Sequence, residues 1–167
     1  MTFPTWTARV MSPCEAAWVA GIIDGEGTIT ARTKPYPGGK RYQIVSLSAC
    51  NTDLDLIARL VEFTGIGRLH YQERVNHKRK EIWQWRTDQR QAAMVLEQLL
   101  PWLTAKRRVA ELLLEMQSLR RPGKYLDGAL ERQRQIIAEV RACNQRGSTD
   151  GTESGSAAAT AAVSESP

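Results

Sequence analysis

Two acidic residues, Asp24 and Glu26, alternate with Gly25 and Gly27 at the end of an apolar stretch. Carboxylate oxygens are ligands that hard divalent cations such as Mg2+ prefer. A bound divalent cation can polarise a phosphate ester and activate a water molecule for hydrolysis. The pattern is therefore compatible with metal-assisted hydrolysis, provided that the chain holds a carboxylate in a defined place.

The residues before the acids predict a helix that would hold them. Ser12 suits the N-cap, Pro13 suits the first helical position, and Glu15 completes a capping box with Ser12. The run 14–23 is almost wholly apolar and rich in small residues, and the two glycines are expected to end the helix. We therefore expect a packed helix over about 13–24 that delivers a carboxylate at its end.

The segment 19–27, Val-Ala-Gly-Ile-Ile-Asp-Gly-Glu-Gly, resembles the signature of the LAGLIDADG homing endonucleases position by position. The order of the elements that follow also resembles this family, and the resemblance covers roughly residues 13–146. A buried helix with a glycine-rich C-cap is the alternative, and the downstream order disfavours it. The resemblance implies an α+β fold with an α-β-β-α-β-β-α core, a four-stranded antiparallel DNA-binding sheet and additional C-terminal helices.

The hydrophobic pattern supports this organisation. After the first helix we expect strands at 28–34 and 42–50, a helix from Thr52 or Asp53 to Gly65, a hairpin with strands at 68–74 and 83–86, and helices at about 88–100, 104 to 120 or 121, and 127–144. Residues 1–146 are predicted to form a single endonuclease domain. Residues 147–167, mostly Ser, Ala, Thr and Gly, are predicted to form a flexible tail.

One face of the predicted sheet carries polar and basic side chains without an acid. The strand residues expected to bind DNA are Thr28, Thr30, Arg32, Lys34, Tyr42, Ser46, Ser48, Arg68, His70, Gln72, Arg74, Gln84 and Arg86. Arg and Gln at strand spacing suit base edges in the major groove. An ordinary solvated sheet face is the alternative, but such faces mix both signs of charge. Alternation puts Trp83 and Trp85 on the core face, and a one-residue slip would move them to the DNA side.

The charge distribution also favours a polyanionic partner. All 23 Lys and Arg residues and 15 of the 18 acidic residues precede Gly147, so this part carries a net charge of +8. Double-stranded DNA is the simplest partner for such a domain. The basic loop residues Lys78, Arg79 and Lys80 are predicted to contact phosphates, and a solubilising hairpin tip is an equal alternative. Arg107, Arg108, Arg120, Arg121 and Lys124 are either further phosphate contacts or plain surface.

The resemblance implies roles for particular residues. It makes Glu26 the catalytic metal ligand, with Gly25 beside it at the metal, and Mg2+ the usual ion, for which another divalent ion such as Mn2+ can substitute. It makes Lys106 the active-site lysine, for which a solvated helix-end lysine is the alternative. Asp24 is expected to cap or brace the helix end. Asn51 and Asp53 lie near the expected site without an assigned role, and Asp53 reads equally well as a helix cap.

A single acid per chain supplies few ligands for a metal ion, and a symmetric dimer would bring two such carboxylates together. Small residues at helical spacing would let two copies of the first helix cross closely, with an expected interface of Ala17, Ala20, Gly21, Asp24 and Gly25. Single-motif members of the family act as homodimers on long, near-palindromic sites and cut both strands, usually in intron homing. An intron RNA maturase, which would bind intron RNA, or a cleavage-inactive DNA-binding regulator on the same fold is the alternative function.

Other sites and locations are disfavoured by the sequence. The three cysteines, Cys14, Cys50 and Cys143, are far apart, and only two histidines are present, so a zinc site is not expected. Reduced thiols fit an intracellular protein, in the cytoplasm, nucleoid or an organelle. We expect no secretion and no membrane partner, because no signal-peptide pattern and no apolar run of membrane-spanning length occurs.

Overall fold

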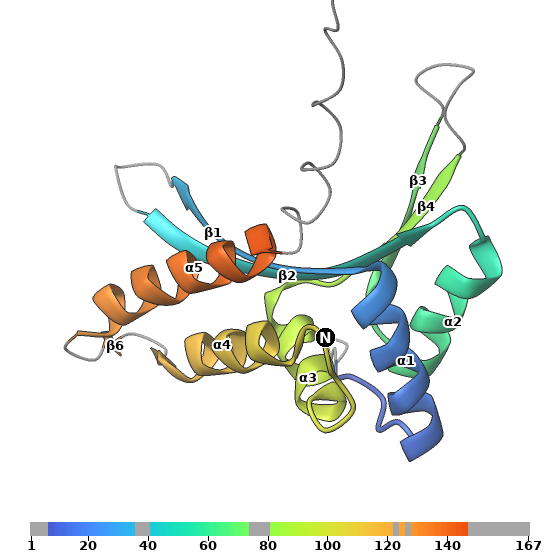
Figure 1. Cartoon of the computed structure of the whole chain (residues 1–167), viewed down its shortest axis with the longest axis horizontal. Coiled ribbons are helices and arrows are strands. Elements are labelled where there is room, and N and C mark those ends of the chain that lie inside the picture. Colours follow the sequence, from blue (N-terminus) through green and yellow to red (C-terminus); the bar gives the residue numbers. More distant parts are fainter. Residues whose placement is uncertain (1–6, 36–40, 74–80, 122–123, 126–127, 147–167) are drawn as a thin grey trace, which may run out of the picture.

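Figure 1 shows the computed structural model of the chain, which describes residues 7–35, 41–73, 81–121, 124–125 and 128–146. The helices are α1 (Pro13–Glu26), α2 (Leu54–Thr64), α3 (Gln89–Leu99), α4 (Arg107–Ser118) and α5 (Ala129–Arg146). The strands are β1 (Gly27–Pro35), β2 (Arg41–Asn51), β3 (Arg68–Gln72), β4 (Ile82–Arg86), β5 (Arg120–Arg121) and β6 (Lys124–Tyr125). The predicted α-β-β-α-β-β-α order, followed by further helices, is confirmed.

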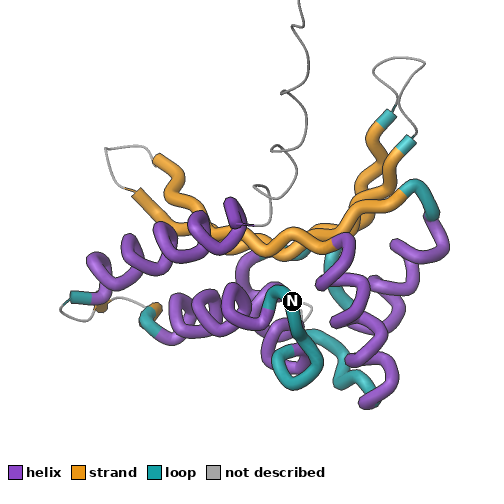
Figure 2. Tube along the Cα trace, viewed as in Figure 1, coloured by secondary structure: helices purple, strands orange, loops and turns teal. Residues whose placement is uncertain are grey.

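The first four strands form one antiparallel sheet in the order β1-β2-β4-β3. Figure 2 shows this sheet edge-on, with the helices on one side and the ends of the strands rising on the other. One row across all four strands holds Thr28, Ser48, Arg86 and Arg68 as successive neighbours. The side of the sheet that carries this row is the side that the helices leave free.

Apolar residues on the helix side of the sheet form the core. Ile29, Leu47 and Trp85 are at most 1% exposed. The Trp85 indole N–H donates to the Ile66 carbonyl at 2.9 Å, which satisfies its one polar atom. Gly67 has a φ of +94°, and a Cβ there would lie 2.1 Å from Trp85 Nε1. The predicted register is therefore confirmed for Trp85, and glycine is required at position 67.

The far end of the β3–β4 hairpin is less covered than the alternation predicted. Leu69 and Tyr71 are 41% and 46% exposed although they lie on the helix side of the sheet. Tyr71 packs against the partly buried Trp83, with 4.8 Å between the ring centroids. The helices thus cover the base of this hairpin and leave its far end bare.

Both predicted ends of the fourth helix are wrong. The helix expected from Thr104 begins at Arg107, and it ends at Ser118 instead of position 120 or 121. Arg120 and Arg121 instead pair with Tyr125 and Lys124 in the short β5–β6 ladder. No helix in the described part of the chain is long and apolar enough to cross a membrane. The predicted tail, 147–167, lies outside the described residues.

Candidate active site and nucleic-acid face

The α1–β1 junction places Glu26 at the surface. α1 runs to Glu26, two residues beyond the predicted end, so Gly25 lies inside the helix and β1 follows at once. The Gly27 N–H donates to the Ile23 carbonyl, and a Cβ on Gly27 would lie 2.5 Å from that oxygen. The direct passage from helix to strand therefore requires glycine at position 27. It leaves the Glu26 side chain exposed.

Asp24 joins the end of α1 to the turn before α4. Its carboxylate accepts hydrogen bonds from the backbone N–H groups of Thr104 at 2.7 Å, Ala105 at 3.2 Å and Lys106 at 2.9 Å. These bonds satisfy N–H groups just ahead of the first turn of α4, which have no acceptor within the helix. The predicted brace is confirmed. The carboxylate of Asp24, also predicted at a dimer interface, is directed at its own chain.

Lys106 is influenced by the charges of both acids. It is the N-cap residue of α4, and its Nζ donates to the backbone carbonyl of Asp24. Partial burial lowers the pKa of Lys106, while the negative charges of Asp24 and Glu26 act in the opposite direction. Partial burial penalises the charged ammonium, and the two nearby acids favour it. The predicted position of Lys106 at the head of a helix, beside the acids, is confirmed, and its catalytic role stays a prediction.

The oxygen atoms at this junction are of the kind that bind a hard cation. Within the described residues no hydrogen bond or ion pair engages the Glu26 carboxylate. Gly25 lies in the last helical turn, where carbonyls lack helical partners and carry partial negative charge. A carboxylate and a carbonyl are oxygen ligands of the kind that Mg2+ takes. The described part of the chain contains no group of three or more His, Cys, Asp or Glu that could hold an ion.

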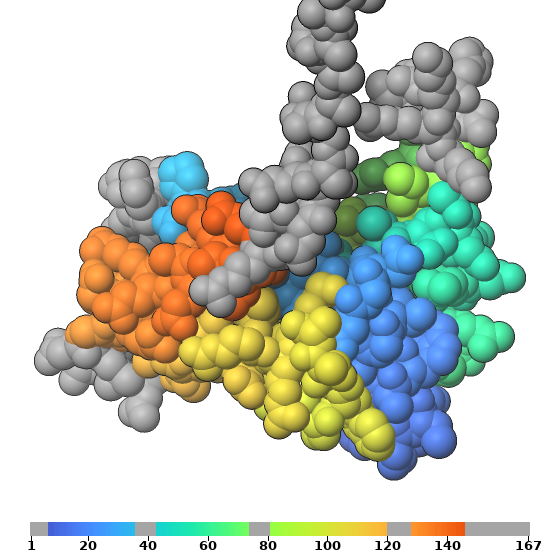
Figure 3. Space-filling view, viewed as in Figure 1, coloured from blue at the N-terminus to red at the C-terminus, as the bar shows by residue number. Residues whose placement is uncertain are grey.

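α1 has two stripes of small residues, and only one faces outward. Ala17 is partly exposed and Gly21 and Gly25 are exposed, with open space where a Cβ would lie on either glycine. Figure 3 shows α1 (blue) open to solvent beside the α3–α4 connection (yellow). Ala16 and Ala20 are 4% and 0% exposed and pack in the chain's own core. The expected role of Ala20 in a dimer interface is therefore wrong.

The free sheet face gathers most of the predicted DNA-binding side chains. Seven of them are exposed: Thr28, Arg32, Lys34, Arg68, His70, Gln72 and Arg86. Thr30 and Ser46 are partly exposed and hydrogen-bond to each other at 2.8 Å, and the Gln84 side chain accepts a hydrogen bond from Arg86. Ser48 is only 9% exposed, so the structure does not support its expected base contact. Over the described residues this face carries no acid.

The structure does not test several of the predicted DNA-binding and active-site residues. Arg74, Lys78, Arg79 and Lys80 lie outside the described residues, and for Tyr42 only its place in β2, opposite Lys34, is described. Asn51 ends β2, and Asp53 is the N-cap of α2, accepting from the N–H groups of Asp55 and Leu56. The cap alternative for Asp53 is thus confirmed. Both positions stay unassigned in catalysis.

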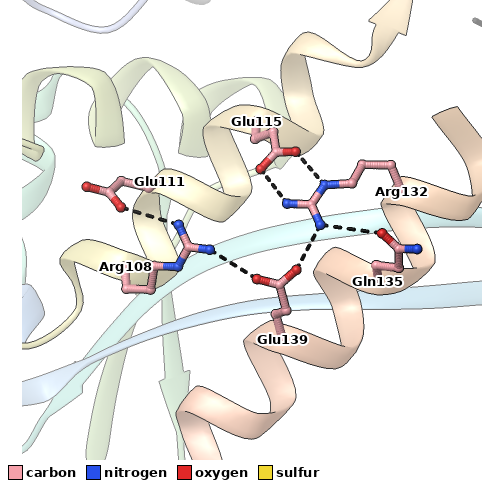
Figure 4. A network of polar contacts seen from close by, with 6 residues as sticks. All are labelled: Arg108, Glu111, Glu115, Arg132, Gln135 and Glu139. Atoms are coloured by element: carbon pink, nitrogen blue, oxygen red, sulfur yellow. Dashed lines mark hydrogen bonds and ion pairs between the residues drawn. The ribbon is translucent and has the colours of Figure 1, made fainter.

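The structure also shows the partners of two arginines whose role the sequence left open. Arg107 pairs with Glu111, and Arg108 pairs with both Glu111 and Glu139. Figure 4 shows Arg132 of α5 between Glu115 of α4 and Glu139. The pairs of Arg108 with Glu139 and of Arg132 with Glu115 join α4 to α5, whereas the Arg107–Glu111 pair lies within α4. Arg107 and Arg108 are therefore paired surface residues. Helix periodicity does not reveal such pairs, because it does not say which helices pack together.

No protein-family model matches the sequence, and no curated protein matches it. Solved structures share its fold. The homing endonuclease I-CvuI, in complex with the uncleaved I-CreI target in the presence of Mg, superposes with a TM-score of 0.66 at 22% identity, over 85% of this chain and 86% of that chain. The archaeal intron-encoded homing endonuclease I-Vdi141I, complexed with DNA, superposes with a TM-score of 0.65 at 16% identity, over 78% of this chain and 84% of that chain.

A third structure carries the family name that the sequence motif suggested. The LAGLIDADG homing endonuclease I-SmaMI, bound to cleaved DNA, superposes with a TM-score of 0.55 at 21% identity, over 76% of this chain and 42% of that chain. The chain therefore has the fold of the LAGLIDADG homing endonucleases. The fold predicted from the signature at 19–27 is confirmed.

Proposed function

We propose that this chain is a sequence-specific, divalent-metal-dependent endonuclease that cuts double-stranded DNA as a homodimer. The observation that carries the proposal is the position of Glu26. It is exposed at the point where the outward stripe of α1 meets the free, acid-free face of the sheet. A carboxylate beside a polyanion-binding surface repels phosphate unless a cation lies between them. The structural likeness to DNA-bound homing endonucleases supports the same conclusion.

A dimer is proposed because one chain offers a single exposed carboxylate, Glu26, as a metal ligand at this junction. The outward stripe of Ala17, Gly21 and Gly25 would let a second copy of α1 approach closely and bring two Glu26 carboxylates near one twofold axis. A single copy of this chain covers only 42% of I-SmaMI, which leaves room in that protein for a second unit of this size. A symmetric pair would read a near-palindromic site, because each sheet would contact one half of the DNA.

The proposed chemistry assigns a task to each residue at the junction. Glu26 and the Gly25 carbonyl would hold Mg2+, or Mn2+ in its place, with further oxygen ligands from the partner chain and the DNA. The ion would polarise the scissile phosphate and acidify the attacking water. The Lys106 ammonium, held by the Asp24 carbonyl, would stabilise the negative charge that develops on the phosphate oxygens. Asp24 keeps Lys106 in place. We also propose that the protein acts inside the cell that holds its DNA target.

The test begins by selecting a binding site from random duplex DNA in the presence of Ca2+. The selected site is then placed in a supercoiled plasmid and incubated with Mg2+, with Ca2+ or with chelator. We expect linear DNA with Mg2+ only, and we expect Glu26→Gln to bind the site while leaving the plasmid uncut. Gln keeps the shape of the side chain but loses the charge that holds the ion.

Other outcomes identify the alternatives. Cutting in chelator, or full cutting by Glu26→Gln, would remove Glu26 and the metal from the mechanism. Specific binding by the wild type without any cutting would favour a regulator, and selection of structured RNA over duplex DNA would favour a maturase.

A further inference from the structure

α5 lies along the open edge of the sheet and closes it. β1 is an edge strand, and α5 contacts it along its length (Figure 1). The Asn144 side-chain amide donates to the Ile29 carbonyl at 3.1 Å. Buried Ile136, Ile137 and Val140 pack the helix against the rest of the domain. An edge strand otherwise presents free backbone groups to other chains, so α5 protects this edge.

A trough runs along the seam between β1 and α5. Two adjoining hollows of about 470 and 420 Å3 lie there, and Arg141 lines both. Their strand side extends from Thr30 to Pro35, which at about 3.3 Å per residue is about 17 Å. Arg32 lines the hollow next to the free sheet face. The trough is therefore continuous with the face that we propose for DNA.

The charges of α5 are sorted between two sides of the helix. Glu139 pairs with Arg108 and Arg132 on the α4 side (Figure 4). Glu131 pairs with Arg134 at 3.4 Å. The trough lining includes arginines 32, 134 and 141 and no carboxylate. Arg141 is exposed and forms no hydrogen bond or ion pair with the described residues. Within the described residues, Arg32 and Arg141 of the seam thus have no ion-pair partner, whereas Arg134 is paired with Glu131.

We propose that this trough binds the sugar–phosphate backbone of the DNA beside the groove read by the sheet, with Arg141 as its main phosphate contact. This inference rests on the proposed function. A two-stranded ribbon occupies a major groove about 12 Å wide. What flanks the outer edge of β1 must therefore lie against a phosphate strand. The length of the trough, about 17 Å, matches half of a B-DNA turn of about 34–36 Å.

The Arg132-centred ion pairs and the Asn144 bond make this contact preorganised. They fix α5 at its α4 side and at the β1 edge, so that Arg141 is already held beside the sheet before DNA arrives. Phosphate contacts fix the register of a protein on DNA and carry no sequence information. The trough should therefore add affinity and orientation without changing which bases are preferred.

The test measures the salt dependence of DNA binding by the full chain. Wild type, Arg141→Gln and the double variant Arg134→Gln/Arg141→Gln are titrated against the selected duplex in Ca2+ at 50–200 mM salt. Each lost phosphate contact lowers the slope of log K against log salt concentration by about 0.9. The ratio of affinities at 50 and 200 mM should then fall by about threefold per contact. Arg59→Gln, an exposed arginine on α2, is the control and should leave the slope unchanged.

The outcomes separate this inference from the proposed function. A lower slope with unchanged base preference and unchanged melting temperature supports it. An unchanged slope in the double variant, or a changed base preference, overturns the inference while wild-type binding and cutting uphold the proposed function. A wild type that binds no duplex DNA at all overturns the proposed function itself.

Discussion

Asp24→Asn tests the link between the end of α1 and Lys106. One Asp24 oxygen accepts from Thr104 and Ala105, and the other accepts from Lys106. Asparagine has the same size but one acceptor oxygen, so it can keep only one of these two groups of bonds. A hydrogen bond to a charged group contributes about 1.5–3 kcal/mol, and the partial exposure of Asp24 puts the expected loss of unfolding free energy at about 2 kcal/mol.

The loss should appear in both stability and pH dependence. About 2 kcal/mol lowers the melting temperature of a domain of this size by about 4–8 °C. Partial burial already lowers the pKa of Lys106, and the Asp24 charge opposes this effect. Removing that charge lowers the pKa of Lys106 further. Because the protonated ammonium is the form proposed to assist cleavage, the alkaline limb of the pH–rate profile should move to lower pH.

The assay combines thermal melting with cleavage rates across the alkaline pH range, measured well below the melting temperature of the variant. Ser12→Ala is the control, since it removes the cap at the other end of α1, about 20 Å from Glu26 at about 1.5 Å per residue. It should cost about 1 kcal/mol and leave the alkaline limb in place. An Asp24→Asn protein with wild-type melting and an unshifted limb would refute the bracing role.

Three further predictions concern the two glycines and the sheet face. Gly21→Leu should keep the fold, since its Cβ meets open space, but should convert a dimer in sedimentation to a monomer; a dimer of wild-type affinity would contradict the proposed interface. Gly27→Ala should lower the unfolding free energy in denaturant by about 2–3 kcal/mol, because its Cβ meets the Ile23 carbonyl at 2.5 Å; unchanged stability would mean that the junction adapts. Arg86→Ala should relax preference at one base position by about 1–3 kcal/mol in competition binding, and a uniform loss at all sites would make it a phosphate contact.

The strand side of the site was predictable because its signal is local. Alternation with a period of two fixes which side chains share a face, and the buried Trp85 confirms the register on which Arg86 and Gln84 depend. The capping box at Ser12 and Glu15 fixed the start of α1 in the same way. The end of α1 was predicted two residues early, because a glycine inside a helix and a glycine after it look alike in sequence.

The faces of α1 were not predictable from its own residues. A helix that is apolar all round does not indicate which stripe meets the core, and so Ala20 was assigned to the wrong side. The bonds from Asp24 to the turn at Thr104 span 80 residues, and no local pattern announces them. The sequence did not predict the seam between α5 and β1 for the same reason. The helical pattern indicates only that Arg134 and Arg141 face solvent, and it does not indicate that β1 lies beside them.

The junction after α1 couples three tasks that could have been separate. α1 passes into β1 without a loop, so the helix proposed to pair with a second chain is rigidly joined to the strand proposed to read DNA. Asp24 ties the same point to Lys106, and the charges of Asp24 and Glu26 both act on the Lys106 ammonium. In the proposed dimer, the distance between the two cutting sites is then set by how closely the outward stripes of α1 cross. A substitution that widens this crossing should therefore impair cutting even where each sheet still holds its half of the DNA.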